Sequence, residues 1–215
     1  MKKQRIAIRK MVISAMLSAI TAVLTFTPIG MIPLPPPLLS VTTVHIPVIV
    51  AALAEGPLVG LLVGLVFGLC SLIRAFTSGM TGLTVFFCNP LISVLPRLLV
   101  PLVTWGCCWL WKKLLPVGRV TEKLGWGVCA ALGALTNTVA VLGMIVLLYE
   151  PALTNLVNEM IAAGNAEAAY VSRAGAWLVA AVGLPNGIAE AVCAALIVPV
   201  VLTAVKAVLK RSNAK

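Results

Sequence analysis

Long apolar stretches, separated by short polar or proline-containing segments, make up most of this chain. They predict helices at about residues 11–26, 43–54, 57–75, 90–111, 124–149 and 174–208. In lipid a backbone must satisfy its own hydrogen bonds, so such stretches favour helices buried in a membrane. The second is shorter than the roughly 20 residues of a full span. We therefore expect it to be tilted, extended at one end or sheltered by other helices.

Residues 42–74 form the centre of this pattern, with two apolar runs joined at Ala54–Pro57. The Glu-Gly-Pro corner supplies a turn, and its proline has a fixed φ that suits the start of the next helix. Gly60, Gly64 and Gly68 then recur every fourth residue. This spacing predicts a flat helix face that another backbone can approach closely.

Composition agrees with a membrane location, because 61% of residues are hydrophobic, 10% are charged and the mean hydropathy is +1.10. We therefore predict an all-α membrane protein, with residues 1–215 forming a single domain of six transmembrane helices. The net charge of +10 does not indicate nucleic-acid binding, since the charges lie at the ends of apolar runs. Six cysteines without a CxxC pattern, and one histidine, predict no metal site, and we expect no cofactor.

The distribution of Lys and Arg predicts the orientation. Thirteen of the sixteen lie at the N-terminus, in the loop 112–123 or near the C-terminus, which six helices would place on one side. The positive-inside rule then puts both termini in the cytoplasm of a multi-pass cell-membrane protein.

Arg97 is the strongest candidate for ligand contact, because an ionisable group inside a membrane is costly. It lies seven residues after Pro90, or roughly 10 Å along a helix at 1.5 Å per residue. Asn89 is expected to cap that helix, and a helix N-terminus with an arginine can hold a carboxylate or a phosphate. The alternative is that Arg97 pairs with Glu190 or with backbone carbonyls.

The other candidates each have a structural alternative. Asn186 and Glu190 share one helix face, and Asn137 can meet them, either around a ligand or as hydrogen bonds between helices. Arg74 can extend to the headgroups, His45 can cap or pack, and Trp177 can anchor the interface or form an aromatic wall. The predicted substrate-binding set is Arg97, Asn89, His45, Asn137, Asn186, Glu190, Trp177 and Arg74.

Three further segments carry expectations. Ala15, Ala19 and Ala22 lie on the first helix as small residues that allow close contact, within the chain or with another membrane protein. The apolar, proline-rich residues 27–41 are either a stiff lid or a loop at the membrane surface. The polar residues 150–173 are expected to contain part of an interfacial helix, and Pro185 is expected to kink the last helix.

These features resemble the substrate-binding S component of energy-coupling factor (ECF) vitamin transporters. The resemblance rests on six helices, the long apolar first loop and Ala15-x-x-x-Ala19. Within the family the chain is most similar to pantothenate-type members, in Thr42–Ile49, in Gly56-Pro57-x-x-Gly60 with Phe67-Gly68, and in Pro96-Arg97.

The resemblance implies that a small vitamin binds on the outer side, between helices four to six and under the loops 27–41 and 76–89. It also implies that the alanines of the first helix dock on a transmembrane scaffold subunit bound to two ATPases. The loaded protein would topple in the bilayer, and ATP hydrolysis by the partner would drive release.

No P-loop, Ser/His/Asp set or paired-carboxylate pattern is present, so the chain is not expected to be an enzyme. Energy for uphill transport would come from a partner or an ion gradient. Three alternatives stay open: an S component for another micronutrient, such as folate, riboflavin or a queuosine precursor; a standalone secondary transporter; and a membrane scaffold that transports nothing.

Overall fold

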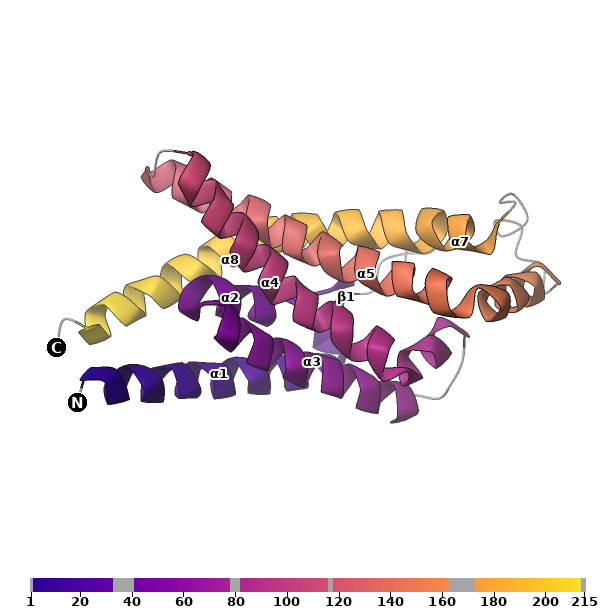
Figure 1. Ribbon diagram of the computed structural model, residues 1–215, viewed down its shortest axis with the longest axis horizontal. Coiled ribbons are helices and arrows are strands. Elements are labelled where there is room, and N and C mark those ends of the chain that lie inside the picture. Colours follow the sequence, from indigo (N-terminus) through magenta and orange to yellow (C-terminus); the bar gives the residue numbers. More distant parts are fainter. Residues whose placement is uncertain (1, 33–40, 78–81, 116–117, 163–172, 214–215) are drawn as a thin grey trace.

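The computed structural model describes residues 2–32, 41–77, 82–115, 118–162 and 173–213 (Figure 1). The long helices are α1 (Lys2–Phe26), α3 (Pro57–Thr77), α4 (Pro90–Leu114), α5 (Arg119–Ala162) and α8 (Leu184–Asn213). The short elements are η1 (Pro28–Gly30), β1 (Met31–Ile32), β2 (Val41–Thr42), α2 (Ile46–Glu55), η2 (Gly82–Cys88), α7 (Ala174–Trp177) and the π-helical segment η3 (Leu178–Gly183). In these described residues the fold is all-α apart from one antiparallel pair of two-residue strands.

Within the described ranges, five helical segments are long and apolar enough to cross a membrane. They are residues 7–26, 57–77, 90–114, 120–162 and 174–208. The sixth predicted helix is α2, which has only 10 residues. Residues 46–52 of this helix are all buried, and it contacts α1, α3, α4, α5 and α8. The other helices therefore shelter α2 from lipid, which is one of the arrangements expected for so short an apolar run.

Several helix ends differ from the apolar runs that predicted them. α1 begins at Lys2 and not near residue 11, because the basic N-terminal residues continue the helix. α5 runs from Arg119 to Ala162, so the predicted bounds 124–149 are too short. The backbone leaves helical geometry only at Tyr149 (φ −133°), after which residues 150–162 are helical again. Hydrophobicity marks the part of a helix suited to lipid, whereas the hydrogen-bonded helix can extend beyond it.

The last predicted helix, 174–208, is interrupted before Pro185 and not at it. The irregular part is η3, whose wider turns end at Gly183. Proline has no N–H to donate and its ring crowds the preceding turn. The π-helical turns lie where that crowding falls, so the predicted kink is displaced toward the N-terminal side of Pro185.

The glycine face of α3 packs closely against α4. A Cβ added to Gly64 would lie 2.5 Å from the Arg97 carbonyl oxygen, and one added to Gly68 would lie 2.8 Å from the Val94 Cα. At Gly60 it would lie 2.7 Å from the Pro101 Cβ. The prediction that another backbone approaches this face is confirmed, and the contact sets where Arg97 stands relative to α3.

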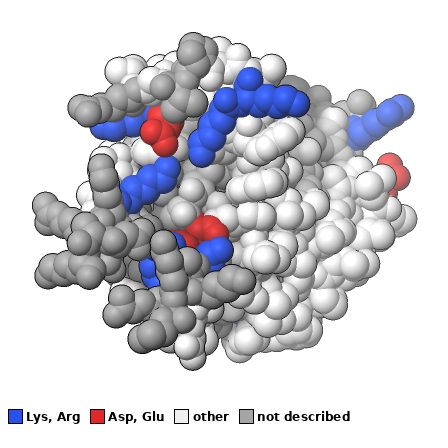
Figure 2. Space-filling view, turned by 60° about the vertical axis from the view of Figure 1, so that its left-hand side comes forward, with Lys and Arg blue, Asp and Glu red and all other residues white. Residues whose placement is uncertain are grey.

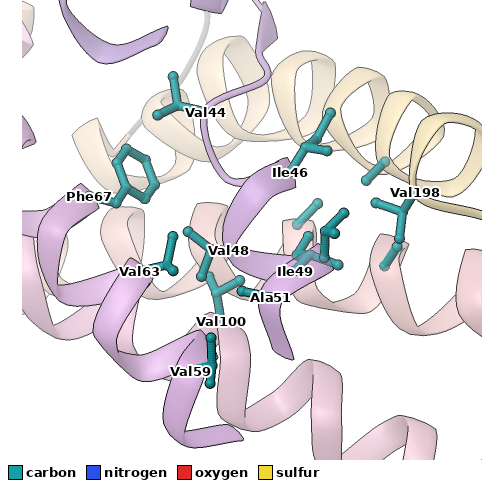
Figure 3. Close-up of a cluster of buried hydrophobic side chains, with 14 residues drawn as sticks. Val44, Ile46, Val48, Ile49, Ala51, Val59, Val63, Phe67, Val100 and Val198 are labelled. Carbon is teal, nitrogen blue, oxygen red and sulfur yellow. The ribbon is translucent and has the colours of Figure 1, made fainter. Parts of the chain in front are cut away.

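A buried cluster joins α2 to its neighbours (Figure 3). Val48 and Ile49 of α2 lie among Val63 of α3, Val100 of α4 and Val198 of α8, and all five are fully buried. Moving a side chain of this size out of water contributes on the order of 2 kcal/mol. Where the alternative surroundings are lipid, this contribution is absent, and close van der Waals packing stabilises the contact instead. This core holds the helices that surround the cavity described below.

The two chain ends lie at the same end of the molecule (Figure 1). Figure 2 shows Lys and Arg side chains gathered there. Arg9 Nη2 lies 3.2 Å from Glu55 Oε2, which ties α1 to the corner between α2 and α3. Lys206 Nζ lies 3.3 Å from Glu122 Oε1, which ties α8 to α5.

Candidate functional site

A cavity of about 240 Å³ lies where α1, α3, α4 and α5 meet β2 and η2. Its wall contains two arginines and several hydroxyl groups, and no aspartate or glutamate occurs among the described residues that line it. The lining residues are Thr25, Thr42, Val44, Phe67, Ser71, Arg74, Ala75, Thr84, Phe87, Arg97 and Asn137. A small cavity with this charge is suited to an anion.

Arg97 lies in this wall between two aromatic rings. Its guanidinium carbon is 5.2 Å from the ring centres of both Phe67 and Phe87. Its Nη1 donates a 2.9 Å hydrogen bond to the Ile92 carbonyl, while its Nε has no hydrogen-bond partner within the described structure. The residue is only 6% exposed. A buried cation with unused donor capacity is able to receive an anionic ligand.

Of the alternatives for Arg97, an ion pair with Glu190 is not observed among the described residues, whereas pairing with a backbone carbonyl is observed at Ile92. Glu190 is instead occupied by donors from two other elements. Its Oε1 accepts from the Thr42 N–H at 3.1 Å and from the Thr42 hydroxyl, and its Oε2 accepts from the Thr138 hydroxyl at 3.1 Å. Glu190 itself does not line the cavity. Its hydrogen bonds with Thr42 hold β2, and Thr42 lines the cavity.

Arg74 also lines the cavity, and its Nη1 donates to the Thr25 carbonyl at 2.7 Å. Thr25 is in the last turn of α1, where backbone carbonyls lack a helical partner. A cation at a helix C-terminus is also favoured by the helix dipole. Arg74 therefore stabilises the end of α1 and contributes positive charge to the cavity.

The polar trio predicted on the last two helices is not joined by hydrogen bonds. Asn137 lines the cavity, and its Oδ1 is buried without a partner. Asn186 Oδ1 is likewise without a partner in the described part of the chain, but Asn186 lies outside the lining, as Glu190 does. The Glu190 carboxylate accepts hydrogen bonds from the Thr42 and Thr138 side chains and not from the two asparagines.

The three remaining candidates lie outside the lining. His45 is at the N-cap position of α2 and is 1% exposed, and neither ring nitrogen has a hydrogen-bond partner among the described residues. Asn89 caps α4, as predicted, by accepting from the Leu91 N–H at 2.9 Å, and it donates to the Tyr149 hydroxyl at 3.0 Å. Trp177 is packed in a hydrophobic cluster with Ile92.

The walls also differ from those implied by the family resemblance. α1 and α3 line the cavity, whereas α8 lies behind β2 and supplies no lining residue. Of the expected covering loops, η2 provides Thr84 and Phe87. Most of the proline-rich loop, residues 33–40, lies outside the described residues.

Comparison with protein families gives one match. The family of ECF transporter substrate-specific components covers residues 9–202. The chain belongs to this family. A search of curated proteins finds no significant match. The family assigns to this S component a small-molecule substrate and ECF partner subunits, and it describes binding subunits, not enzymes.

In this S component, sequence reasoning missed several lining residues. Phe67 and Ser71 are two of these, and they lie at helical spacing from the predicted Arg74 on α3. Their place on the same helix face could therefore have been inferred from Arg74. Thr25 and Phe87 lie in distant segments. No local signal connects those two, because only the packing of α1 and η2 against α3 brings them to the cavity.

The small-residue face of the S component is on the outside of α1. Ala15 and Ala19 are exposed and Ala22 is partly exposed, whereas Thr21 and Thr25 are buried. Packing within the chain therefore occupies the threonine face of α1 and leaves Ala15 and Ala19 exposed.

Proposed function

We propose that this S component captures a small anionic vitamin, with pantothenate as the favoured substrate, in the cavity that contains Arg97. The observation that best supports an anionic ligand is the lining of the cavity, which has two arginines and no carboxylate among its described residues. Arg97 would bind the carboxylate of the vitamin, and Phe67 and Phe87 restrict the orientation of the guanidinium. Arginine is well suited to this task because its planar donors match a carboxylate.

The size and chemistry of the cavity favour pantothenate over larger vitamins. Pantothenate combines one carboxylate with an amide and two hydroxyl groups, and the lining offers arginine, asparagine, threonine and serine side chains. The volume of about 240 Å³ lies below the roughly 300–1,000 Å³ typical of sites for drug-sized ligands. The ring systems of folate and riboflavin need more space.

We further propose that the chain crosses the membrane six times with both termini in the cytoplasm. In support, the termini and a concentration of Lys and Arg lie at one end of the molecule (Figure 2). The exposed Ala15 and Ala19, with Ala22 beside them, would dock on a transmembrane scaffold subunit bound to two ATPases. Hydrolysis of ATP in these partners would drive delivery of the vitamin inside.

The test is to titrate the purified chain in detergent with pantothenate, following tryptophan fluorescence, with calorimetry as a check. Riboflavin, folate and thiamine serve as comparison ligands. Saturable, tight binding of pantothenate alone supports the proposal. Binding of a different vitamin refutes the substrate but not the role of the cavity. A folded protein that binds none of them contradicts the pantothenate assignment.

A further inference from the structure

Two hydroxyl groups of the cavity have their protons committed elsewhere. The Thr42 hydroxyl donates to Glu190 Oε1, and the same carboxylate oxygen accepts from the Thr42 N–H. The Thr25 hydroxyl donates to the Thr21 carbonyl at 2.8 Å. A hydroxyl has one proton and two lone pairs, so each of these oxygens can offer only lone pairs to a ligand.

Asn137 carries both kinds of group, an acceptor oxygen that is closed off from the cavity and a donor N–H₂. Asn137 Oδ1 is buried without a partner among the described residues, and Asn137 lines the cavity. Arg97 and Arg74, in contrast, are donors without acceptor capacity. In the cavity wall, Arg97 and Arg74 therefore offer only donors and the Thr25 and Thr42 hydroxyls offer only lone pairs, while Ser71 and the Asn137 amide keep both capacities.

We propose that this site selects a ligand that carries hydrogen-bond donors, hydroxyl or amide N–H, in addition to its anionic group, and that Glu190 sets this preference through Thr42. The inference rests on the proposed function of the cavity as the substrate site. The arginines take the anion, and the Thr25 and Thr42 hydroxyls accept from the donors. A ligand that lacks a donor leaves a buried acceptor without a partner, which is costly.

Glu190 is thus a positioning residue, not a ligand contact. It fixes Thr42 by taking both of the Thr42 donors, and Thr138 of α5 holds its other oxygen. Without this carboxylate, the Thr42 hydroxyl is free to rotate and donate, and the wall no longer distinguishes a donor from an acceptor at that point.

The experiment compares pantothenate with its two analogues in which one hydroxyl is replaced by hydrogen. Calorimetry measures each of them on the full-length wild-type chain and on Thr42→Val, which removes the hydroxyl at nearly constant shape. We expect Thr42→Val to weaken pantothenate binding at least tenfold. Binding of one deoxy analogue should change less than twofold, because its interaction with Thr42 is already lost. Thr136→Val, at a partly buried threonine of α5 outside the cavity lining, is the matched control.

The role of Glu190 is tested by the same selectivity and by rescue. Glu190→Ala should reduce the preference for pantothenate over that deoxy analogue to less than threefold. Glu190→Gln should keep most of it, because an amide oxygen still accepts from Thr42 while the amide N–H₂ donates to Thr138. A merely structural role would lower both affinities together and leave their ratio unchanged.

The outcomes separate this inference from the proposed function. If pantothenate binds tightly and Thr42→Val weakens it and both analogues equally or not at all, the inference is wrong and the proposed substrate stands. If ascorbate, another hydroxyl-bearing anion, binds in place of pantothenate and loses tenfold in Thr42→Val, the substrate is wrong and the inference stands. If neither anion binds to the folded protein, both are overturned.

Discussion

Replacing Arg97 by methionine is the most direct test of the site, because it removes the charge and keeps the length of the side chain. A carboxylate that enters the cavity would then lose a buried, charged partner. Removing one member of a buried ion pair typically costs about 3–5 kcal/mol, or about 150-fold to 4,000-fold in affinity at 1.4 kcal/mol per tenfold. Arg74 still lines the cavity, so we expect a loss in the lower half of this range.

The ligand-free protein should not lose stability in Arg97→Met. Arg97 forms no ion pair among the described residues, and the structure gives it one hydrogen bond to the Ile92 carbonyl and contacts to two rings. These contacts only partly offset the cost of burying a charge. Exchanging buried charge for well-packed apolar side chains is often neutral or stabilising by about 1–4 kcal/mol.

The assay combines calorimetric titration with thermal unfolding in detergent, on the wild type, Arg97→Met and Arg97→Lys. Lysine keeps the charge without the planar donors, so its affinity should be intermediate. Lys113→Met, on the same helix beside Trp109, is the matched loss of charge away from the cavity and should bind normally. Unchanged affinity in Arg97→Met, with Tm also unchanged, would refute the role of Arg97 as the anion site.

Three further perturbations follow from the packing. Gly64→Val forces a side chain against the backbone of α4, and overpacking of this kind costs about 1–3 kcal/mol. It should lower Tm by several degrees and weaken ligand binding. An unchanged Tm would mean that α3 and α4 can move apart at little cost. Ala15→Trp with Ala19→Trp should abolish ATP-driven uptake in the assembled transporter but preserve ligand binding, and uptake that survives would exclude this face as the docking surface. Arg9→Ala leaves the Glu55 side chain, which is 2% exposed, without its ion-pair partner and should lower the free energy of unfolding by about 3 kcal/mol. Adding Glu55→Gln should recover most of this loss. Equal stability of Arg9→Ala and of the double variant would argue against the ion pair.

Each of these variants has a control within the chain. Gly106→Val places a side chain where nothing lies within 4 Å, so Tm should hardly change. Ala152→Trp adds one tryptophan, half of the bulk of the double variant, at an exposed position on α5, away from α1. Lys206→Ala breaks the ion pair with Glu122, but both side chains are 34% exposed, so the loss should be below about 1 kcal/mol.

The candidate site was predictable where a single residue conflicts with its surroundings. Arg97 stands out in an apolar helix, and Asn89-Pro90 has the pattern of a helix cap. Glu190 stands out for the same reason, but its partners do not. Thr42 lies 148 residues away and Thr138 lies 52 residues away, and threonines are common in apolar helices, so their position in the chain did not mark them.

The same limit explains why the predicted walls differ from the lining of this cavity. The candidates Asn137, Asn186 and Glu190 were grouped because helical spacing places two of them on one face. Spacing defines a face but not what the face meets. α8 meets β2 and α5 there, so Glu190 holds the chain behind the cavity while Arg74 and Thr25 of α3 and α1 reach the cavity itself.

By itself, the sequence determined that this is a helical membrane protein, since so little polar surface is available to face water. It also determined the approximate helices, the close face of α3 and Arg97 as the leading candidate for ligand contact, because periodicity, glycine spacing and a buried charge are local properties. Only the tertiary structure decided which helices enclose the cavity, which aromatic rings flank Arg97 and where the Thr42 proton goes. These depend on contacts between distant segments, and such contacts arise only when the helices pack.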